Sequence, residues 1–291
     1  MLFVCDERNG FNCIYRESIK DGLSRLPHHL QWLSQAFIRF YRGVSQLHYG
    51  RDGTGALIAQ CSRGVHQGDG AGMIYFSAGM DAALTRLRAE FPNANIQAYA
   101  DDVSGDVGEK DRTLVSVDLP ALGKATPEGD MPTAAAIIQR WKQLAAECGL
   151  EVRVDKCHVT SPDGDPRQEE YGEVDVSDGF LMMGIPFGKP AWEKEKCTEI
   201  AAQVAGVYTN ARLVETKQSA QLLSVYCGGV ACVNHLLRST DTATHRRACA
   251  TVDDATTAAL RTQLGVDSLT PTQAAQCNLP LRHGGLGYRR A

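Results

Sequence analysis

Apolar and polar positions along the first third of the chain follow two different periods, which predicts strands and helices in mixed order. Leu2 to Cys5 is a short apolar run that ends at Asp6, as expected for a buried strand with a carboxylate at its C-terminal end. Apolar residues then recur at helical spacing up to breaks at Pro27 and Pro92. The elements predicted before Pro92 are a strand over 2–5, helices over 11–23 and 30–41, a hairpin of strands over 44–49 and 56–61, and a helix over 73–90.

The remaining two thirds change from mixed to helical character. An apolar run over 96–100 leads into Asp101 and Asp102 at the tip of a predicted hairpin. The later elements predicted are a helix over 133–148 capped by Gly149, strands over 150–154 and 157–160, a polar insert over 161–178, a hairpin over 181–187, and helices over 191–213, 216–237 and 243–264. The pattern predicts an α+β domain over 1–188, with an antiparallel sheet backed by helices on one face, and an all-α region over 189–291.

Composition places the chain among ordinary globular proteins. Its 291 residues are 43% hydrophobic and 22% charged, enough to bury a sizeable core. No run approaches the roughly 18 apolar residues of a membrane span, and no basic segment of a signal peptide precedes Asp6. We therefore predict an intracellular protein, nuclear or cytoplasmic, without a secretory or transmembrane segment. The ten cysteines include no C-x-x-C pair and are predicted to be reduced thiols.

Charge is distributed unevenly along the chain. The net charge is -4, but residues 189–291 carry 12 Lys+Arg against 8 Asp+Glu, or +4, while residues 1–188 carry 18 against 26, or -8. Divalent cations can neutralise acidic residues at a metal-dependent site, and a basic C-terminal region can hold a nucleic-acid backbone. A mildly acidic protein with no polyanionic partner is an alternative that composition leaves open.

Three aspartates are the candidates for chemistry. Asp6 ends the first predicted strand, and Asp101 and Asp102 follow a second one. Adjacent aspartates are common in turns, so the pair alone also fits an ordinary hairpin. Three carboxylates on two adjacent strands, however, can hold two Mg²⁺ ions about 4 Å apart, the arrangement used in nucleotidyl transfer. We expect the three carboxylates to lie close enough to share two Mg²⁺ ions, with Mn²⁺ as a possible substitute.

Several segments resemble the motifs of reverse transcriptases of non-LTR retrotransposons, in their usual order. Residues 6–12, with an aromatic five positions after Asp6, are similar to the first palm motif. Residues 63–70 resemble the second, a G-x-x-Q-G loop, although proline is more usual where Gly70 stands. The string Tyr99-Ala100-Asp101-Asp102 matches the third, Y-x-D-D, and is the most specific signal. Further similarity is found at Lys156 (fourth motif), 181–188 (the L-G-x-P-x-G primer grip), 218–238 (thumb) and 279–287 (the L-P-x-x-x-G-G-L-G element).

The resemblance implies roles for individual residues. Asp6, Asp101 and Asp102 would bind metal, and Lys156 would assist the leaving pyrophosphate. Phe11 would be the steric gate that selects deoxynucleotides, although it could also be a core residue of an amphipathic helix. Lys156 could equally be a surface lysine, and 181–188 a turn between domains. The substrate-binding residues implied are Phe11, Gln67, Gly68, Tyr99 and Gly184.

The activity implied is that of an RNA-directed DNA polymerase, which adds deoxynucleotides to a primer 3′ end. Its partners would be an RNA template, a DNA primer and deoxynucleoside triphosphates, with no membrane. Residues 1–188 would be the palm and 189–291 the thumb and the connection that follows. Family members have fingers before the first motif, so we expect an N-terminally truncated palm. Two alternatives are a catalytically inactive retroelement fragment that still binds nucleic acid, and an unrelated metal-dependent hydrolase.

Overall fold

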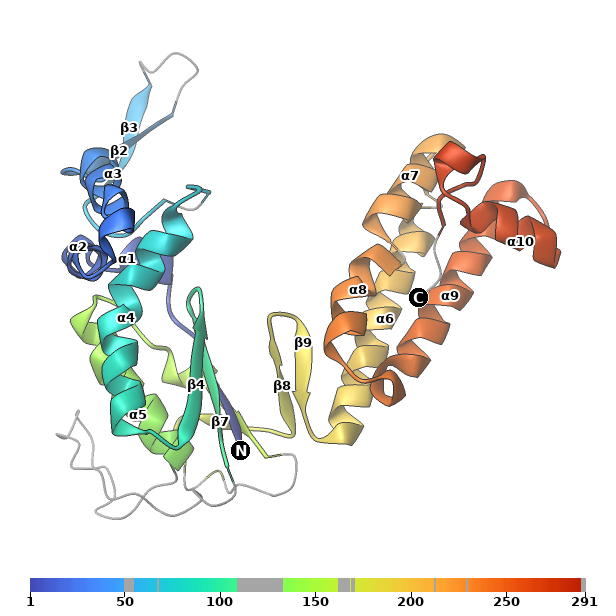
Figure 1. The fold of residues 1–291 in the computed structure, drawn as a ribbon. Helices are drawn as coiled ribbons and strands as arrows, with labels where there is room; N and C mark the ends of the chain where they lie inside the picture. Colours follow the sequence, from blue (N-terminus) through green and yellow to red (C-terminus); the bar gives the residue numbers. More distant parts are fainter. Residues whose placement is uncertain are drawn as a thin grey trace. The chain divides into compact units, whose positions relative to one another are not determined.

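The computed structural model describes residues 1–49, 55–66, 68–108, 133–161, 168, 171–211, 213–228 and 230–288. The chain forms two compact units, Met1–Ser177 and Asp178–Ala291 (Figure 1). The hairpin predicted over 181–187 is therefore part of the second unit. The turn predicted between the strands 44–49 and 56–61 lies mostly outside the described residues.

The first unit is an α+β domain. Its elements are β1 (Leu2–Cys5), α1 (Gly10–Cys13), α2 (Arg16–Ser24), η1 (His28–Leu30), α3 (Trp32–Phe40), β2 (Ser45–Tyr49), β3 (Ala56–Cys61), α4 (Gly72–Glu90), β4 (Ala94–Tyr99), β5 (Asp102–Val107), α5 (Thr133–Glu147), η3 (Val154–Lys156), β6 (His158–Thr160) and β7 (Asp175–Val176). Strands β2 and β3 form a separate antiparallel hairpin, as the sequence predicted.

The first unit contains a five-stranded sheet in the order β4-β5-β1-β6-β7. Neighbours from β4 to β6 are antiparallel, but β7 runs parallel to β6, with Asp175 opposite His158. The sheet is therefore mixed, and the prediction of a purely antiparallel sheet is wrong at this edge. A strand of two residues within the polar insert is too short to show any periodicity.

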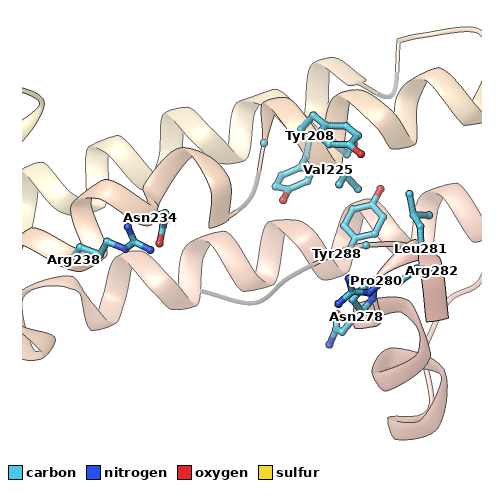
Figure 2. Close-up of a pocket in the computed structure, with 13 residues that line it drawn as sticks. Tyr208, Val225, Asn234, Arg238, Asn278, Pro280, Leu281, Arg282 and Tyr288 are labelled. Atoms are coloured by element: carbon cyan, nitrogen blue, oxygen red, sulfur yellow. The ribbon is translucent and has the colours of Figure 1, made fainter. Parts of the chain in front are cut away.

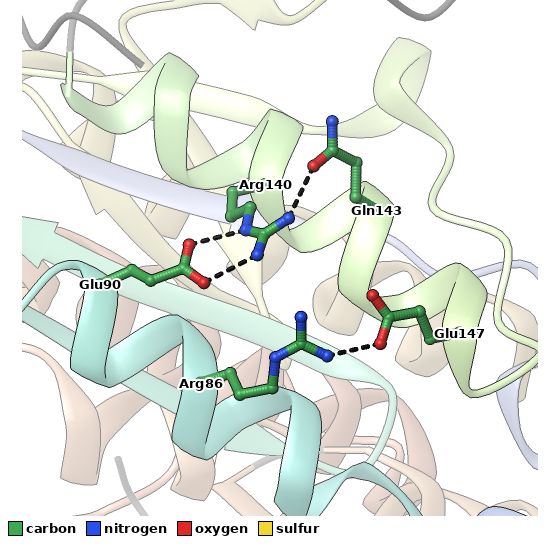
Figure 3. A network of polar contacts seen from close by, with 5 residues as sticks. All are labelled: Arg86, Glu90, Arg140, Gln143 and Glu147. Carbon is green, nitrogen blue, oxygen red and sulfur yellow. Dashed lines mark hydrogen bonds and ion pairs between the residues drawn. The ribbon is translucent and has the colours of Figure 1, made fainter. Parts of the chain in front are cut away.

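Helices α4 and α5 cover one face of the sheet (Figure 1). Trp141 and most other apolar side chains of α5 are buried, and the helix packs against β1 and β5. Polar contacts join the two helices on their outer side (Figure 3). Arg140 donates to both carboxylate oxygens of Glu90, at 2.6 and 2.7 Å, and lowers the pKa of that carboxyl, while Arg86 pairs with Glu147. Solvent-accessible ion pairs such as these contribute little to the stability of the fold.

Three predicted elements differ from the structure. The helix predicted over 11–23 is divided into α1 and α2, because the backbone N–H of Tyr15 donates to Cys148 (2.8 Å) and leaves the helical hydrogen-bond pattern. The strand predicted over 150–154 is reduced to an isolated bridge between Glu7 and Val152, followed by η3. The helix predicted over 216–237 is two helices, since Gly228 has an extended backbone.

The second unit is a hairpin followed by helices. Its elements are β8 (Gly179–Met182), β9 (Ile185–Gly188), α6 (Pro190–Ala211), α7 (Lys217–Cys227), α8 (Val230–Ser239), α9 (Thr242–Leu264), α10 (Pro271–Asn278) and η5 (Leu281–His283). Helix α10 was not predicted. Helices α6 and α9 pack along each other through small residues such as Ala201 and Ala248. The prediction of an α+β domain followed by a helical region is thus confirmed.

Two further predictions concern cysteines and membranes. All ten cysteines lie among the described residues and are free thiols. Among those residues, the stretch Lys217–Ser239 is long and apolar enough to be a candidate membrane span by length and composition alone. This is weak evidence, because helices of a soluble core pass the same test, and Gly228 interrupts this stretch. The absence of a membrane span stays a prediction.

Candidate active site

Strand pairing brings the predicted carboxylates to the same end of two inner strands of the sheet. In the antiparallel ladder of β1 and β5, Cys5 lies opposite Val103. Asp6 follows Cys5 where β1 ends, and Asp102 precedes Val103 where β5 begins. Continuing the register by one residue places the backbones of Asp6 and Asp102 opposite each other. Positions almost a hundred residues apart are therefore neighbours at the same end of two adjacent strands.

Asp101 occupies the tight turn of the β4–β5 hairpin. Tyr99 and Asp102 are the last paired residues, so Ala100 and Asp101 form the turn. Ala100 has a φ of 56°, in the left-handed region that costs free energy for a residue with a Cβ atom. Tight two-residue hairpins need positive φ angles, and here that geometry holds Asp101 at the tip. Helix α1 approaches closely, because a Cβ atom added to Gly10 would lie 3.1 Å from the Cβ of Asp101.

A polar cavity of about 270 Å³ opens beside these residues. Asp6, Asp101, Phe11 and Lys156 all line it. The Lys156 ammonium lies 4.0 Å from a carboxylate oxygen of Asp6, and both side chains are about half exposed. The half-buried ring of Phe11 stacks on Phe76, with 4.5 Å between the ring centroids. Four residues predicted from distant parts of the sequence thus share one small cavity.

Negative charge accumulates at this end of the two strands. Partial burial raises the pKa of the Asp102 carboxyl, and the charges of Asp101 and Asp6 raise it further. Nearby like charges raise a carboxyl pKa because they disfavour its ionisation. Such a site attracts cations.

Glu7 is a fourth carboxyl at this site, and the sequence analysis did not single it out. Its side chain is buried, and Oε1 accepts a hydrogen bond from the indole N–H of Trp141 at 3.0 Å. The other oxygen, Oε2, has no hydrogen-bond partner among the residues that the structure describes. Burial raises the pKa of Glu7 to about 8; the Trp141 hydrogen bond lowers it, while the charges of Asp101, Asp102 and Asp6 raise it. The sequence offers one indication of this residue, because Glu7 is a second acidic residue directly after the strand-terminal Asp6.

The donor atoms at this end of the two strands fit a hard divalent cation. Asp6, Asp101 and Asp102 offer carboxylate oxygens, which Mg²⁺ prefers, and their mutual repulsion would be relieved by a cation. In the part of the chain that the structure describes, no three His, Cys, Asp or Glu side chains converge in an arrangement that could hold a metal ion. Binding would therefore require these carboxylates to rotate toward one another about their side-chain bonds.

The glycine-rich loop before α4 is tied to α1. The backbone N–H groups of Gly64 and Val65 donate to the carbonyls of Ile14 and Phe11, each at 2.8 Å. Gly64 has a φ of 66°, and a Cβ atom there would lie 2.3 Å from the Phe11 carbonyl oxygen. Only glycine permits this approach. The loop therefore packs directly against the segment that contains the candidate gate residue.

Asp69 holds the same loop in place through hydrogen bonds. It directly precedes Gly70, the position at which the second motif usually has proline. Its Oδ1 accepts from the N–H of Ala71 at 2.9 Å, and its Oδ2 accepts from the Tyr41 hydroxyl at 2.5 Å. The Tyr41 oxygen in turn accepts from the N–H of His66 at 3.0 Å. Burial, and then the Asp69 hydrogen bond, raise the pKa of Tyr41 to about 12, so the hydroxyl stays a donor. Side-chain hydrogen bonds thus order a loop that has Gly70 in place of proline.

Arg16 holds the surroundings of this loop together. Its buried guanidinium donates to the carbonyls of Gly64 (3.1 Å), Tyr41 (3.2 Å) and Gly43, and to Ser45 and Cys61 on the β2–β3 hairpin. The same group lies 5.2 Å from the centre of the Tyr41 ring. None of these partners is a carboxylate, so carbonyl oxygens satisfy the buried charge. No periodic pattern in the sequence indicates this role, because a basic residue at a helix start is usually solvated.

Replacing Arg16 with glutamine is expected to lower the free energy of unfolding by about 2 to 4 kcal/mol, because several buried carbonyl groups would lose their donor. Chemical denaturation of the two proteins measures the difference. Arg25→Gln, which removes an exposed pair with Asp21 at the end of α2, is the matched control and is expected to cost less than about 1 kcal/mol. Equal losses for both variants would contradict the role given to Arg16.

The remaining predicted site residues are placed as follows. Gln67 lies outside the described residues. Gly68 is exposed, has a φ of 88° and has open space around it. Tyr99 is 63% exposed at the end of β4. Gly184 belongs to the turn between β8 and β9, where Met183 and Gly184 both have positive φ angles, and it lies in the second unit. The structure therefore brings together Asp6, Asp101, Asp102, Phe11 and Lys156.

Comparison of the sequence with protein-family models and with curated proteins found no match. The chemistry available to this site therefore follows from its own residues and geometry. Those are clustered carboxylates at the ends of two strands, a cationic side chain beside Asp6 and an aromatic ring on the wall of the cavity.

Proposed function

We propose that this chain is an RNA-directed DNA polymerase module that adds deoxynucleotides to a primer 3′ end with two Mg²⁺ ions. The observation that carries the proposal is the β1–β5 register, which sets Asp6 opposite Asp102 beside the strained turn at Asp101. If Asp101 and Asp102 were only turn residues, the presence of a third carboxylate from another strand beside them would have no explanation. The motif order described above supports the same activity.

Each residue around the cavity has a defined task in this reaction. Two bound Mg²⁺ ions would activate the primer hydroxyl and stabilise the leaving pyrophosphate. Asp6 and Asp101 supply oxygen ligands, and Asp102 assists from the start of β5. Lys156, close to Asp6, presents its ammonium to the triphosphate. The ring of Phe11, fixed by its stack on Phe76, takes the space that a ribose 2′-hydroxyl would need.

The second unit is proposed to contain the thumb and the hairpin that grips the primer. Residues 1–188 would then be the palm. The hairpin β8–β9 would belong to the palm in function, although it packs against helices of the second unit. The positive charge of residues 189–291 suits the phosphate backbone of a primer–template. An RNA template and a DNA primer are the expected partners.

Primer extension tests this proposal. The purified chain is incubated with an oligo(dT) primer on a poly(rA) template, deoxythymidine triphosphate and Mg²⁺ or Mn²⁺. Extension that stops when EDTA is added is the expected result. No extension with either metal, together with binding of the primer–template that weakens as salt rises, would instead favour the catalytically inactive nucleic-acid-binding fragment.

Replacing Phe11 with valine is expected to raise the use of ribonucleotides relative to deoxynucleotides by about 10- to 100-fold, because a smaller side chain leaves room for the 2′-hydroxyl. Steady-state incorporation of the two triphosphates gives the ratio. Phe40→Val, at a ring that is 73% exposed on α3, is the control and should leave the ratio unchanged. An unchanged ratio in the Phe11 variant would assign the residue to the hydrophobic core alone.

A further inference from the structure

The second unit contains a cavity of about 750 Å³ that the proposed polymerase chemistry does not use. It lies between helices α7 and α8 and the turn that follows α10 (Figure 2). That turn is part of the segment 279–287, whose L-P-x-x-x-G-G-L-G pattern has no role in the site described above. The segment contributes Pro280, Leu281, Arg282 and Gly287 to the lining of the cavity.

Two buried tyrosines form fixed parts of the lining. The Tyr208 hydroxyl is hydrogen-bonded to Thr256 at 2.9 Å, and the Tyr288 hydroxyl donates to Gln263 at 2.7 Å. These hydrogen bonds inside the protein satisfy both hydroxyls and hold the two rings in place. The turn is held as well, since Gln276 donates to the Gly284 carbonyl at 2.7 Å. The cavity is therefore part of the folded unit rather than a gap between loose segments.

The rim of the cavity is positively charged. Arg238 on α8 and Arg282 in the turn are both exposed, and no ion pair with Asp or Glu is formed by either within the described residues. Arg282 instead donates to the ring of His283 at 3.2 Å. Among the described residues that line the cavity, none is an aspartate or glutamate. The unit as a whole, 178–291, has 12 Lys+Arg against 9 Asp+Glu, or +3.

An exposed aromatic ring and an amide complete the lining. Tyr226 on α7 is 68% exposed although it borders the cavity. Asn234, one helical turn before Arg238, offers a donor and an acceptor on the same side of α8 (Figure 2). Aromatic stacking, cationic groups for phosphates and an amide for base edges are the features that bind unpaired nucleotides.

We propose that this cavity binds an unpaired nucleotide of a single-stranded nucleic acid, with the base on Tyr226 and phosphates of the same strand at Arg238 and Arg282, which lie at opposite ends of the cavity (Figure 2). A duplex offers phosphates but keeps its base faces stacked, so it cannot use the ring. The volume suits one nucleotide and is too small for a helix of nucleic acid. An apolar peptide would leave both arginines without an anionic partner. The site is separate from the aspartate cluster and needs no divalent cation.

Fluorescence anisotropy of the full chain in EDTA tests the proposal with a labelled oligouridylate of about eight nucleotides, a length within the usual site size of single-strand binders. Tyr226→Ala is expected to weaken binding by about 5- to 100-fold, as expected when one base no longer stacks. The double variant Arg238→Gln/Arg282→Gln should reduce the slope of log affinity against log salt by about 0.7 for each phosphate that is no longer neutralised. Binding measured in EDTA cannot depend on divalent cations held by the aspartates, which separates this site from the polymerase proposal.

Control variants and competitors distinguish binding at this cavity from nonspecific electrostatic binding of the oligonucleotide to the protein surface. Arg246→Gln removes an exposed arginine of α9 that does not line the cavity, and Leu213→Ala removes an apolar side chain that is 82% exposed. Both should bind like the wild type, and an unlabelled duplex should compete poorly. Wild-type affinity in Tyr226→Ala, or an equal loss in Arg246→Gln, would overturn the proposal. Circular dichroism confirms folding, and if Tyr226→Ala unfolds, the arginine variants alone decide.

Discussion

The Asp101→Asn variant is expected to incorporate deoxynucleotides at least about a thousandfold more slowly than the wild type. Asparagine has nearly the same shape as aspartate, so the turn after Ala100 should form unchanged. It lacks the negative charge that holds and orients a divalent cation, and removing such a ligand costs several kcal/mol of transition-state stabilisation. Single-nucleotide extension on an RNA template, followed under excess enzyme, measures the loss.

The matched control for this variant is Asp254→Asn, at an exposed aspartate of α9 in the other unit. It should extend primers at the wild-type rate. Because the charge of Asp101 raises the pKa of Asp102, its removal should also leave the thermal stability unchanged or slightly higher. Extension by Asp101→Asn within tenfold of the wild type would show that the turn carboxylate has no part in catalysis.

The Glu7→Gln variant is expected to become more stable than the wild type as pH rises from about 5 to about 8.5. The pKa of Glu7 is raised from 4.5 to about 8 in the folded protein, mainly by burial. A raised folded-state pKa stabilises the fold below the unfolded value of 4.5, and this contribution is lost as pH rises toward 8. At 1.36 kcal/mol per pKa unit, the total loss is about 5 kcal/mol.

Glutamine is neutral throughout this range and can still accept the Trp141 hydrogen bond through its amide oxygen. The difference in unfolding free energy between the two proteins, measured in EDTA at several pH values, should therefore grow with pH. Glu151→Gln, at a glutamate whose side chain is 62% exposed, is the control and should keep the pH dependence of the wild type. A Glu7→Gln protein that is less stable than the wild type at pH 8.5 would show that burial does not raise the pKa of Glu7.

The parts of this site that depend on local pattern could be predicted from the sequence. The apolar run before Asp6 and the hairpin before Asp102 are visible as short periodic segments, and the register that joins them follows once both are strands of one sheet. Helix α4 is predicted to within one residue of its start because its apolar positions and flanking breaks are unambiguous. Local pattern thus singled out Asp6 and Asp101, whereas Phe11 and Lys156, which line the same cavity, were named only through the motif resemblance.

Features that depend on tertiary contacts could not be predicted in this way. The break between α1 and α2 exists because Tyr15 donates to Cys148, a residue more than a hundred positions away. Arg16 and Glu7 look like ordinary charged residues in the sequence, and only their burial against carbonyl groups or Trp141 gives them a role. Periodicity shows which face of an element is apolar, but it does not show which polar group lies across from it.

The most direct test of the shared carboxylate site is to locate Mn²⁺ in crystals of the protein soaked with this ion above pH 8, using its anomalous scattering. The proposed chemistry predicts two ions held by Asp6, Asp101 and Asp102, and their loss in the Asp101→Asn variant. Crystals of the wild type with no manganese at these aspartates, or with a single ion bound elsewhere on the protein, would contradict it.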